Sequence, residues 1–250
     1  MKKYELTDET KVYAGITLRR IKSLIDITDR GVKAGDLGGW IEKESNLSHD
    51  GDAWVGGSAT VYGNATVNNN AYVCGCASVS DSAVLSDSAC VSDDARIFGG
   101  AIVSDNAFIF GNAHIFDNAR VFGKANVCDI ASVRGNASVF DDACVCGNSS
   151  VLGDSHVFGD SRISGNAFVS GSANITNRND IIWFSNVGTE NGTLTVFKNK
   201  DGGLSCARAC FRGTIEEFLA KSDAVHTDDI KQQYKLMIEI AKLKIVVDKS

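Results

Sequence analysis

Proline is absent from all 250 residues, although ordinary usage would supply about twelve. Because proline has no backbone N–H, its absence leaves every residue able to join a long hydrogen-bonded ladder. The chain also lacks any apolar run near the roughly 18 residues of a membrane span. Residues 1–11 (MKKYELTDETK) lack the apolar segment of a signal peptide. We therefore expect a cytoplasmic protein without a membrane partner.

Basic residues are outnumbered, since 25 Lys+Arg stand against 31 Asp+Glu and give a formal net charge of −6. A protein that holds a phosphate backbone needs the opposite balance, so we do not expect nucleic acid as a partner.

The eight cysteines lack the spacing of a secreted disulfide framework, because six fall inside a repeat at positions that Ser, Phe or Asn also occupy. We expect free thiols in a reducing compartment.

A six-residue repeat fills the middle of the chain. Residues 53–178 form 21 consecutive hexapeptides without insertion or deletion, in the pattern Ala-x-Val-x-Gly/Asp-Asn/Ser/Asp. The third position is Val, Ile or Leu in every unit, and the first is Ala in 18 units and Ser in three. A weaker unit at residues 47–52 favours a backward extension of the repeat.

This spacing predicts a β-solenoid. Positions one and three share one face of an extended strand and fill the interior, whereas positions two and four point outward. Positions five and six are mostly residues that tolerate the left-handed backbone of a tight corner. Three strands and three corners form a triangular coil, so the 21 units predict about seven coils. Asp and Gly tend to alternate along the corner columns, which keeps like charges apart.

The repeat resembles the hexapeptide family of left-handed parallel β-helices. The resemblance covers about half of the chain. It implies the left-handed coil, which the period alone does not determine. We predict an all-β solenoid of this kind with a small N-terminal β cap and a mixed α/β C-terminal cap. The expected regions are the N-terminal cap at 1–46, the β-helix at 47–178 and the C-terminal cap at 179–250.

The two caps carry local signals of their own. β-prone stretches at 16–18 and 24–27 favour strands before the repeat, and stretches at 181–184 and 192–197 predict two strands after it. Thr214, with Glu217 three residues later, is a capping-box signal for a helix over about 215–221. A second helix is expected from residue 227 or 228 to 242, with an apolar face that includes Tyr234 and Ile238.

The flanking segments narrow the resemblance. GDLGGWIEKESNLS at 35–48, IIWFSNVG at 181–188, GTLTVF at 192–197 and CFRGTIEEF at 210–218 are similar to segments of phage and prophage-encoded hexapeptide-repeat proteins. The YdcK-like proteins are bacterial relatives of that set, whose members are often labelled as transferases. The resemblance implies the cytoplasm of a bacterial host cell and does not imply a particular reaction.

Outward phenylalanines form a run on one side of the predicted prism, here called face three. Phe122, Phe140 and Phe158 stand one coil apart, and Val84 and Ile102 lie on the same face. A contiguous apolar stripe marks an interface, and the resemblance implies side-by-side trimers. We predict that these five residues form the contact of a homotrimer. The alternative is that a cap or the C-terminal helix folds back over them.

Face two, the next side, combines cations with aromatic rings. The candidate ligand-binding residues fall within three coils, with the last one round the next corner: Arg96, Phe98, His114, Phe116, Arg134 and Arg120. Guanidinium groups pair with phosphate, and aromatic rings stack on bases. The pattern predicts a small anionic, nucleotide-like ligand. The alternative is a ladder of Arg and Phe that only covers the sheet.

Face one carries three clustered thiols, Cys128, Cys144 and Cys146. Three thiolates could hold zinc, but the neighbouring outward positions offer no evident fourth ligand, so we predict no metal site.

The three units that begin with Ser instead of Ala are consecutive. We interpret these inward hydroxyls as structural groups that donate to nearby backbone carbonyls.

Three classes of function fit this chain. We favour a non-catalytic, phage-type binding protein without a cofactor, a host-interaction or anti-defence factor that sequesters the small anion in clefts between protomers or binds a host protein. The alternative is an acyltransferase that uses acetyl-CoA, with His114 preferred over His156 as the base because cations and rings surround it. No coil has an inserted loop to build an acyl-donor pocket, which favours the first class. The third class is a structural scaffold.

Overall fold

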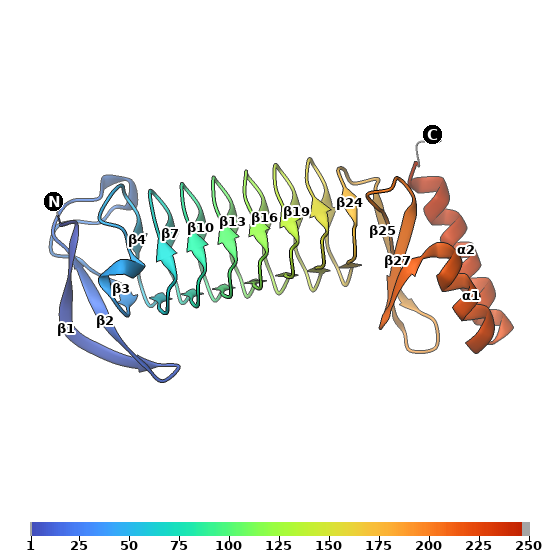
Figure 1. The fold of residues 1–250 in the computed structure, drawn as a ribbon, viewed down its shortest axis with the longest axis horizontal. Helices are drawn as coiled ribbons and strands as arrows, with labels where there is room; N and C mark the ends of the chain where they lie inside the picture. The colour runs from blue at the N-terminus through green and yellow to red at the C-terminus, as the bar shows by residue number, and fades with distance from the viewer. Residues whose placement is uncertain (1, 247–250) are drawn as a thin grey trace.

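Each hexapeptide contributes one two-residue strand, and strands 18 residues apart pair in parallel to form a solenoid with three sheets (Figure 1). This computed structural model describes residues 2–246. Face one consists of β4 (Trp54–Val55), β7 (Tyr72–Val73), β10 (Cys90–Val91), β13 (Phe108–Ile109), β16 (Asn126–Val127), β19 (Cys144–Val145) and β22 (Arg162–Ile163). Face two consists of β3 (Leu37–Ile41), β5 (Thr60–Val61), β8 (Ser78–Val79), β11 (Arg96–Ile97), β14 (His114–Ile115), β17 (Ser132–Val133), β20 (Ser150–Val151) and β23 (Phe168–Val169). Face three consists of β6 (Thr66–Val67), β9 (Val84–Leu85), β12 (Ile102–Val103), β15 (Arg120–Val121), β18 (Ser138–Val139), β21 (His156–Val157) and β24 (Asn174–Ile175).

The interior of the solenoid is filled as the repeat predicts. Every aliphatic residue at the third position, from Val55 to Ile175, is 0% exposed. Two of the inward serines donate to backbone carbonyls, Ser149 to Cys146 at 2.7 Å and Ser155 to Leu152 at 2.6 Å. The hydroxyl of Ser161, the third, has no hydrogen-bond partner within residues 2–246.

The corners explain why aspartate recurs in the repeat. All seven aspartates at the fifth position have left-handed backbones, with φ between +55° and +58°. Their carboxylates accept a backbone N–H from the corner of the next coil, as Asp93 does from Gly111 at 3.0 Å and Asp117 from Gly135 at 3.1 Å. The acids therefore tie neighbouring coils together. The donor is a glycine, which adopts the left-handed backbone readily, for six of the seven, and it is Asp105 for Asp87.

The solenoid has about eight turns, one more than the hexapeptide count predicts. β3 adds to face two in parallel, with Trp40 opposite Thr60 and Ile41 opposite Val61, and Leu47 bridges to Val67 on face three. The extra turn uses the same backbone ladder. Leu47 confirms the backward extension expected from the weaker unit at 47–52, whereas β3 lies outside the six-residue pattern.

An antiparallel hairpin closes the N-terminal end. β1 (Tyr4–Tyr13) pairs with β2 (Ile16–Ser23), and β2 pairs with β3. Two short 3-10 turns follow, η1 (Thr28–Arg30) and η2 (Glu44–Asn46). The strand expected at 24–27 is wrong, because only Ile27 makes a bridge there, to Val32. Side chains of this cap cover Trp54, which is 2% exposed although it occupies an outward position.

A four-stranded antiparallel sheet and two helices close the other end (Figure 1). The sheet consists of β25 (Ile181–Val187), β26 (Gly192–Lys198), β27 (Leu204–Arg208) and β28 (Phe211–Thr214). One side of it, with Ile181 and Phe197, joins the solenoid core. The other side packs against α1 (Ile215–Val225) and α2 (Asp228–Lys244).

The sequence signals located most of this C-terminal cap. The first two strands and both helices are confirmed, and Thr214 and Glu217 form the expected capping box, with bonds of 3.2 and 2.9 Å. The sequence analysis does not predict the last two strands, because residues 204–214 (LSCARACFRGT) contain few β-branched or aromatic residues.

Close stacking should make a side chain cost more at a corner glycine that faces the next coil than at one that faces open space. Gly111 and Gly171 share a φ of +67°, but a Cβ on Gly111 would lie 2.9 Å from the carbonyl oxygen of Asp129, whereas nothing lies within 4 Å of one on Gly171. We expect Gly171→Ala to lower the free energy of unfolding by about 1–2 kcal/mol, the cost of a left-handed alanine. Gly111→Ala should lower it further. Urea unfolding of both variants measures the difference, and equal losses would contradict close stacking.

Candidate functional site

Face two contains a hollow of about 260 Å³ near its N-terminal end. Parallel pairing places Tyr62, Ser80 and Phe98 in one outward column, and Ser78 and Arg96 in the column beside it. Ser80 therefore lies between the larger residues Tyr62 and Phe98, and the small Ser78 lies beside it, one coil before Arg96. The hollow exists because the coil register puts these serines next to each other, and we call it the face-two slot.

The N-terminal hairpin forms one wall of the face-two slot. Tyr13, the last residue of β1, lines it and meets the ring of Tyr62 edge to face, with ring centres 5.8 Å apart. Two cations hold the hairpin in place over Trp40 of β3, with Lys11 Nζ 4.7 Å and the Arg20 guanidinium carbon 5.6 Å from the ring centre. These contacts place an aromatic residue from the cap over the solenoid face.

Arg96 gives the face-two slot its charge. The residue is exposed, and its guanidinium makes no hydrogen bond or ion pair with any residue in the described range 2–246. Asp81 also lines the slot, but its Oδ2 already accepts the backbone N–H of Gly99 at 3.0 Å. The arrangement leaves a cation with open donors beside aromatic walls.

The aromatic surface continues beyond the face-two slot along the solenoid. Phe98 and Phe116 are stacked, with ring centres 4.8 Å apart and planes 5° from parallel, and the Arg134 guanidinium carbon lies 5.8 Å from the Phe116 ring. The Nε atom of Arg134 is buried without a hydrogen-bond partner among the described residues. Burial, and then the nearby charge of Arg96, lower the pKa of His114. Its imidazole is therefore neutral at pH 7.

The structure gathers five of the six candidate ligand residues on face two. Arg96 and Phe98 line the face-two slot, whereas His114 lies one strand further along. Arg120 lies on face three, between Ile102 and Ser138, and does not line the slot.

Sequence reasoning missed the two tyrosines of the slot. The repeat pattern could have identified Tyr62, because it is a large outward residue two coils before Phe98. No sequence pattern could have identified Tyr13, because its position depends on how the hairpin folds against the solenoid.

Face three carries the expected phenylalanine stripe. Phe122, Phe140 and Phe158 form a continuous stack, with ring centres 4.8 and 4.7 Å apart and planes within 3° of parallel. Val84 and Ile102 lie directly opposite each other on adjacent strands of the same face. The helices lie beyond the last coil (Figure 1). The alternative in which the C-terminal helix folds back over the stripe is therefore wrong for the described chain.

Two thiols of the face-one cluster, Cys128 and Cys144, lie where burial disfavours the thiolate form. Ligand atoms of Cys128, Cys146 and Asp129 lie within 4.8 Å of one another, and Cys144 is not in this group. Burial raises the pKa of the Cys128 thiol to about 12 and also raises that of Cys144. Asp129 already accepts the backbone N–H of Gly147 at 2.8 Å, so its carboxylate serves a corner like the other aspartates.

The stacked coils define the chain as a hexapeptide-repeat parallel β-solenoid protein. A family model described as YdcK Beta solenoid repeat matches residues 59–75, one coil of this solenoid. No curated protein matches the chain. Within residues 2–246, neither helix is both long and apolar enough to cross a membrane.

Removal of the phenylalanine stripe tests its role as an interface. If copies associate through face three, replacing Phe122, Phe140 and Phe158 with Ser should convert the oligomer to monomers, because the main apolar area of the contact is lost. Light scattering coupled to size-exclusion chromatography measures the mass. Phe108→Ser with Phe110→Ser is the control, since it removes a stacked pair with centres 4.6 Å apart from face one. An unchanged mass in the triple variant would exclude the stripe as the contact.

Proposed function

We propose that this β-solenoid is a non-catalytic binding protein that holds a small anionic, nucleotide-like ligand in the face-two slot. One observation carries the proposal: the guanidinium of Arg96, which has no hydrogen-bond or ion-pair partner among residues 2–246, stands beside a gap between the aromatic residues Tyr62 and Phe98. A guanidinium pairs with a phosphate through parallel hydrogen bonds, and the rings offer stacking surfaces for a base.

The spacing of the coils suits an aromatic guest. Tyr62 and Phe98 stand two coils apart, or about 10 Å, and a ring placed halfway would lie about 5 Å from each. Aromatic pairs favour centre-to-centre distances of about 4.5–7 Å, and Phe98 and Phe116 already stack at 4.8 Å. The hollow of 260 Å³ accommodates one end of a nucleotide. The remainder of the ligand would extend over the open surface towards His114.

The proposal includes assembly of this chain into a homotrimer through the face-three stripe. The ring stack repeats with the coil spacing, so three copies arranged around a three-fold axis parallel to the solenoid can bring their stripes together at equal heights. Several identical slots in one assembly would sequester a ligand without turning it over. Such sequestration is the activity that a phage-type host-interaction or anti-defence factor would use.

The acyltransferase alternative is supported by one observation. A general base must be unprotonated, and burial together with Arg96 keeps His114 in that state near neutral pH. However, His114 does not line the face-two slot, and residues 53–178 contain no inserted loop. We expect no release of coenzyme A from acetyl-CoA above the background rate. Release that His114→Gln abolishes would instead favour the enzyme.

Ligand retention tests the binding proposal. Native mass spectrometry of protein purified from a bacterial host should show added mass in the nucleotide range, and calorimetry should detect binding of adenosine monophosphate. Arg96→Gln should weaken that binding at least tenfold, since a charge-assisted pair contributes roughly 1.5–3 kcal/mol. Arg162→Gln, an exposed arginine of face one, is the matched control and should have no effect. Equal binding by both variants would refute a role for Arg96.

A further inference from the structure

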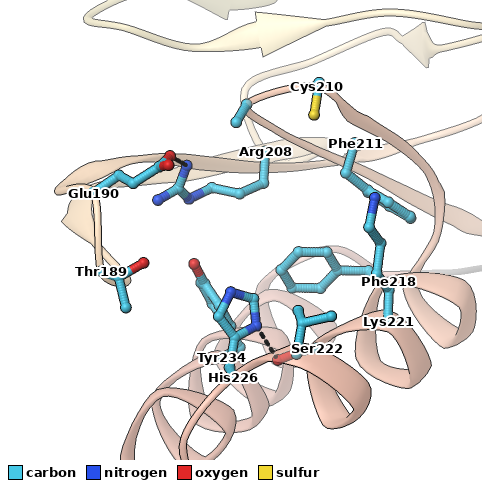
Figure 2. Close-up of a pocket in the computed structure, with 12 residues that line it drawn as sticks. Thr189, Glu190, Arg208, Cys210, Phe211, Phe218, Lys221, Ser222, His226 and Tyr234 are labelled. Carbon is cyan, nitrogen blue, oxygen red and sulfur yellow. Dashed lines mark hydrogen bonds and ion pairs between the residues drawn. The ribbon is translucent and has the colours of Figure 1, made fainter.

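A second cavity, of about 180 Å³, lies inside the C-terminal cap (Figure 2). It opens between the β25–β26 turn, the β27–β28 turn, α1 and the start of α2. The residues that matter here are Arg208, Glu190, Phe211, Phe218, Lys221 and Tyr234. None of them belongs to the face-two slot or to the phenylalanine stripe.

Arg208 places a buried positive charge at this cavity. Its side chain is only 9% exposed, and its Nη2 donates to the carbonyl of Val187 at 3.0 Å. Its Nε is buried with no hydrogen-bond partner in the described residues. A buried charge is costly unless it is paired and its donors are satisfied. The arrangement favours an anion at the guanidinium.

Within residues 2–246, Arg208 forms an ion pair with one carboxylate, that of Glu190, and this pair is weak. Glu190 Oε2 lies 3.9 Å from Nη1, beyond hydrogen-bond distance, and the Glu190 side chain is 76% exposed. Exposed ion pairs of this kind contribute about 0–1 kcal/mol. Another carboxylate that reaches the guanidinium at hydrogen-bond distance can therefore take its place.

Aromatic rings provide an apolar wall opposite the charge. Phe218 contacts Phe211 and Tyr234, with ring centres 5.3 and 5.0 Å apart. Lys221 Nζ lies 5.6 Å from the centre of the Phe211 ring and adds a second cation at the cavity. Figure 2 shows Arg208 and the rings of Phe211 and Phe218 around one space.

We propose that this cavity binds a small organic carboxylate with an aromatic or branched apolar body. The carboxylate pairs with Arg208 and displaces Glu190, and the apolar body packs on Phe211 and Phe218. The volume is below the roughly 300 Å³ at which sites for drug-sized ligands begin, so it suits a single-ring acid.

Titration with benzoate tests the site on the full chain. The side-chain N–H resonances of Arg208 should shift in a saturable way, because the added carboxylate replaces Glu190 at the guanidinium. Glu190→Gln should raise the affinity about threefold, since it removes the competing carboxylate. Glu239→Gln, which changes an exposed acid of α2 that pairs with Lys242, is the matched control and should leave benzoate binding unchanged.

Other outcomes overturn the proposal. It fails if benzoate gives no saturable shift, or if Glu190→Gln and Glu239→Gln bind it alike. It also fails if inorganic phosphate binds more tightly than benzoate, because the apolar wall would then have no role. Arg208→Gln should weaken benzoate binding at least tenfold, whereas Arg96→Gln should leave it unchanged, which separates this site from the face-two slot.

Discussion

The parallel ladder between coils is the constraint on which the rest of this protein depends. It places each residue directly beside the residue 18 positions later, as it does for Arg96 and His114. An outward side chain therefore has fixed neighbours one coil away on either side, at the strand spacing of about 4.8 Å. Phenylalanines at this interval stack into ladders, and a serine at this interval leaves a gap between the residues that flank it.

The corners stabilise this register with carboxylates. Asp93 and Asp117 each accept an N–H from the glycine of the next coil. A carboxylate bound in this way stabilises the solenoid and is not free to bind a ligand. The surface can therefore carry many acids although its candidate binding sites are cationic. The donor in the next coil is a glycine for six of the seven aspartates, and for Asp87 it is Asp105.

Both candidate sites involve a cap that departs from this regularity. A stack of similar coils presents evenly ridged faces with open hollows, such as the one beside Lys124 and Asp142. Tyr13 from the hairpin turns a gap between coils into the face-two slot. The C-terminal cavity lies wholly within the cap, where Arg208 is buried among elements that do not repeat. The two guanidinium groups differ accordingly, because Arg96 is exposed beside its slot and Arg208 is desolvated.

The hexapeptide pattern by itself determined the coil and its buried aliphatic column. It also determined which faces carry Arg96 and Phe122, because a strict six-residue period assigns every side chain to one face. The capping box at Thr214 likewise located α1, since it depends on residues three positions apart. Only the tertiary structure decided that β3 forms an additional turn, that Tyr13 reaches face two and that Arg208 is buried beside Phe218. These contacts join segments without a common period, and their geometry follows from how the caps pack.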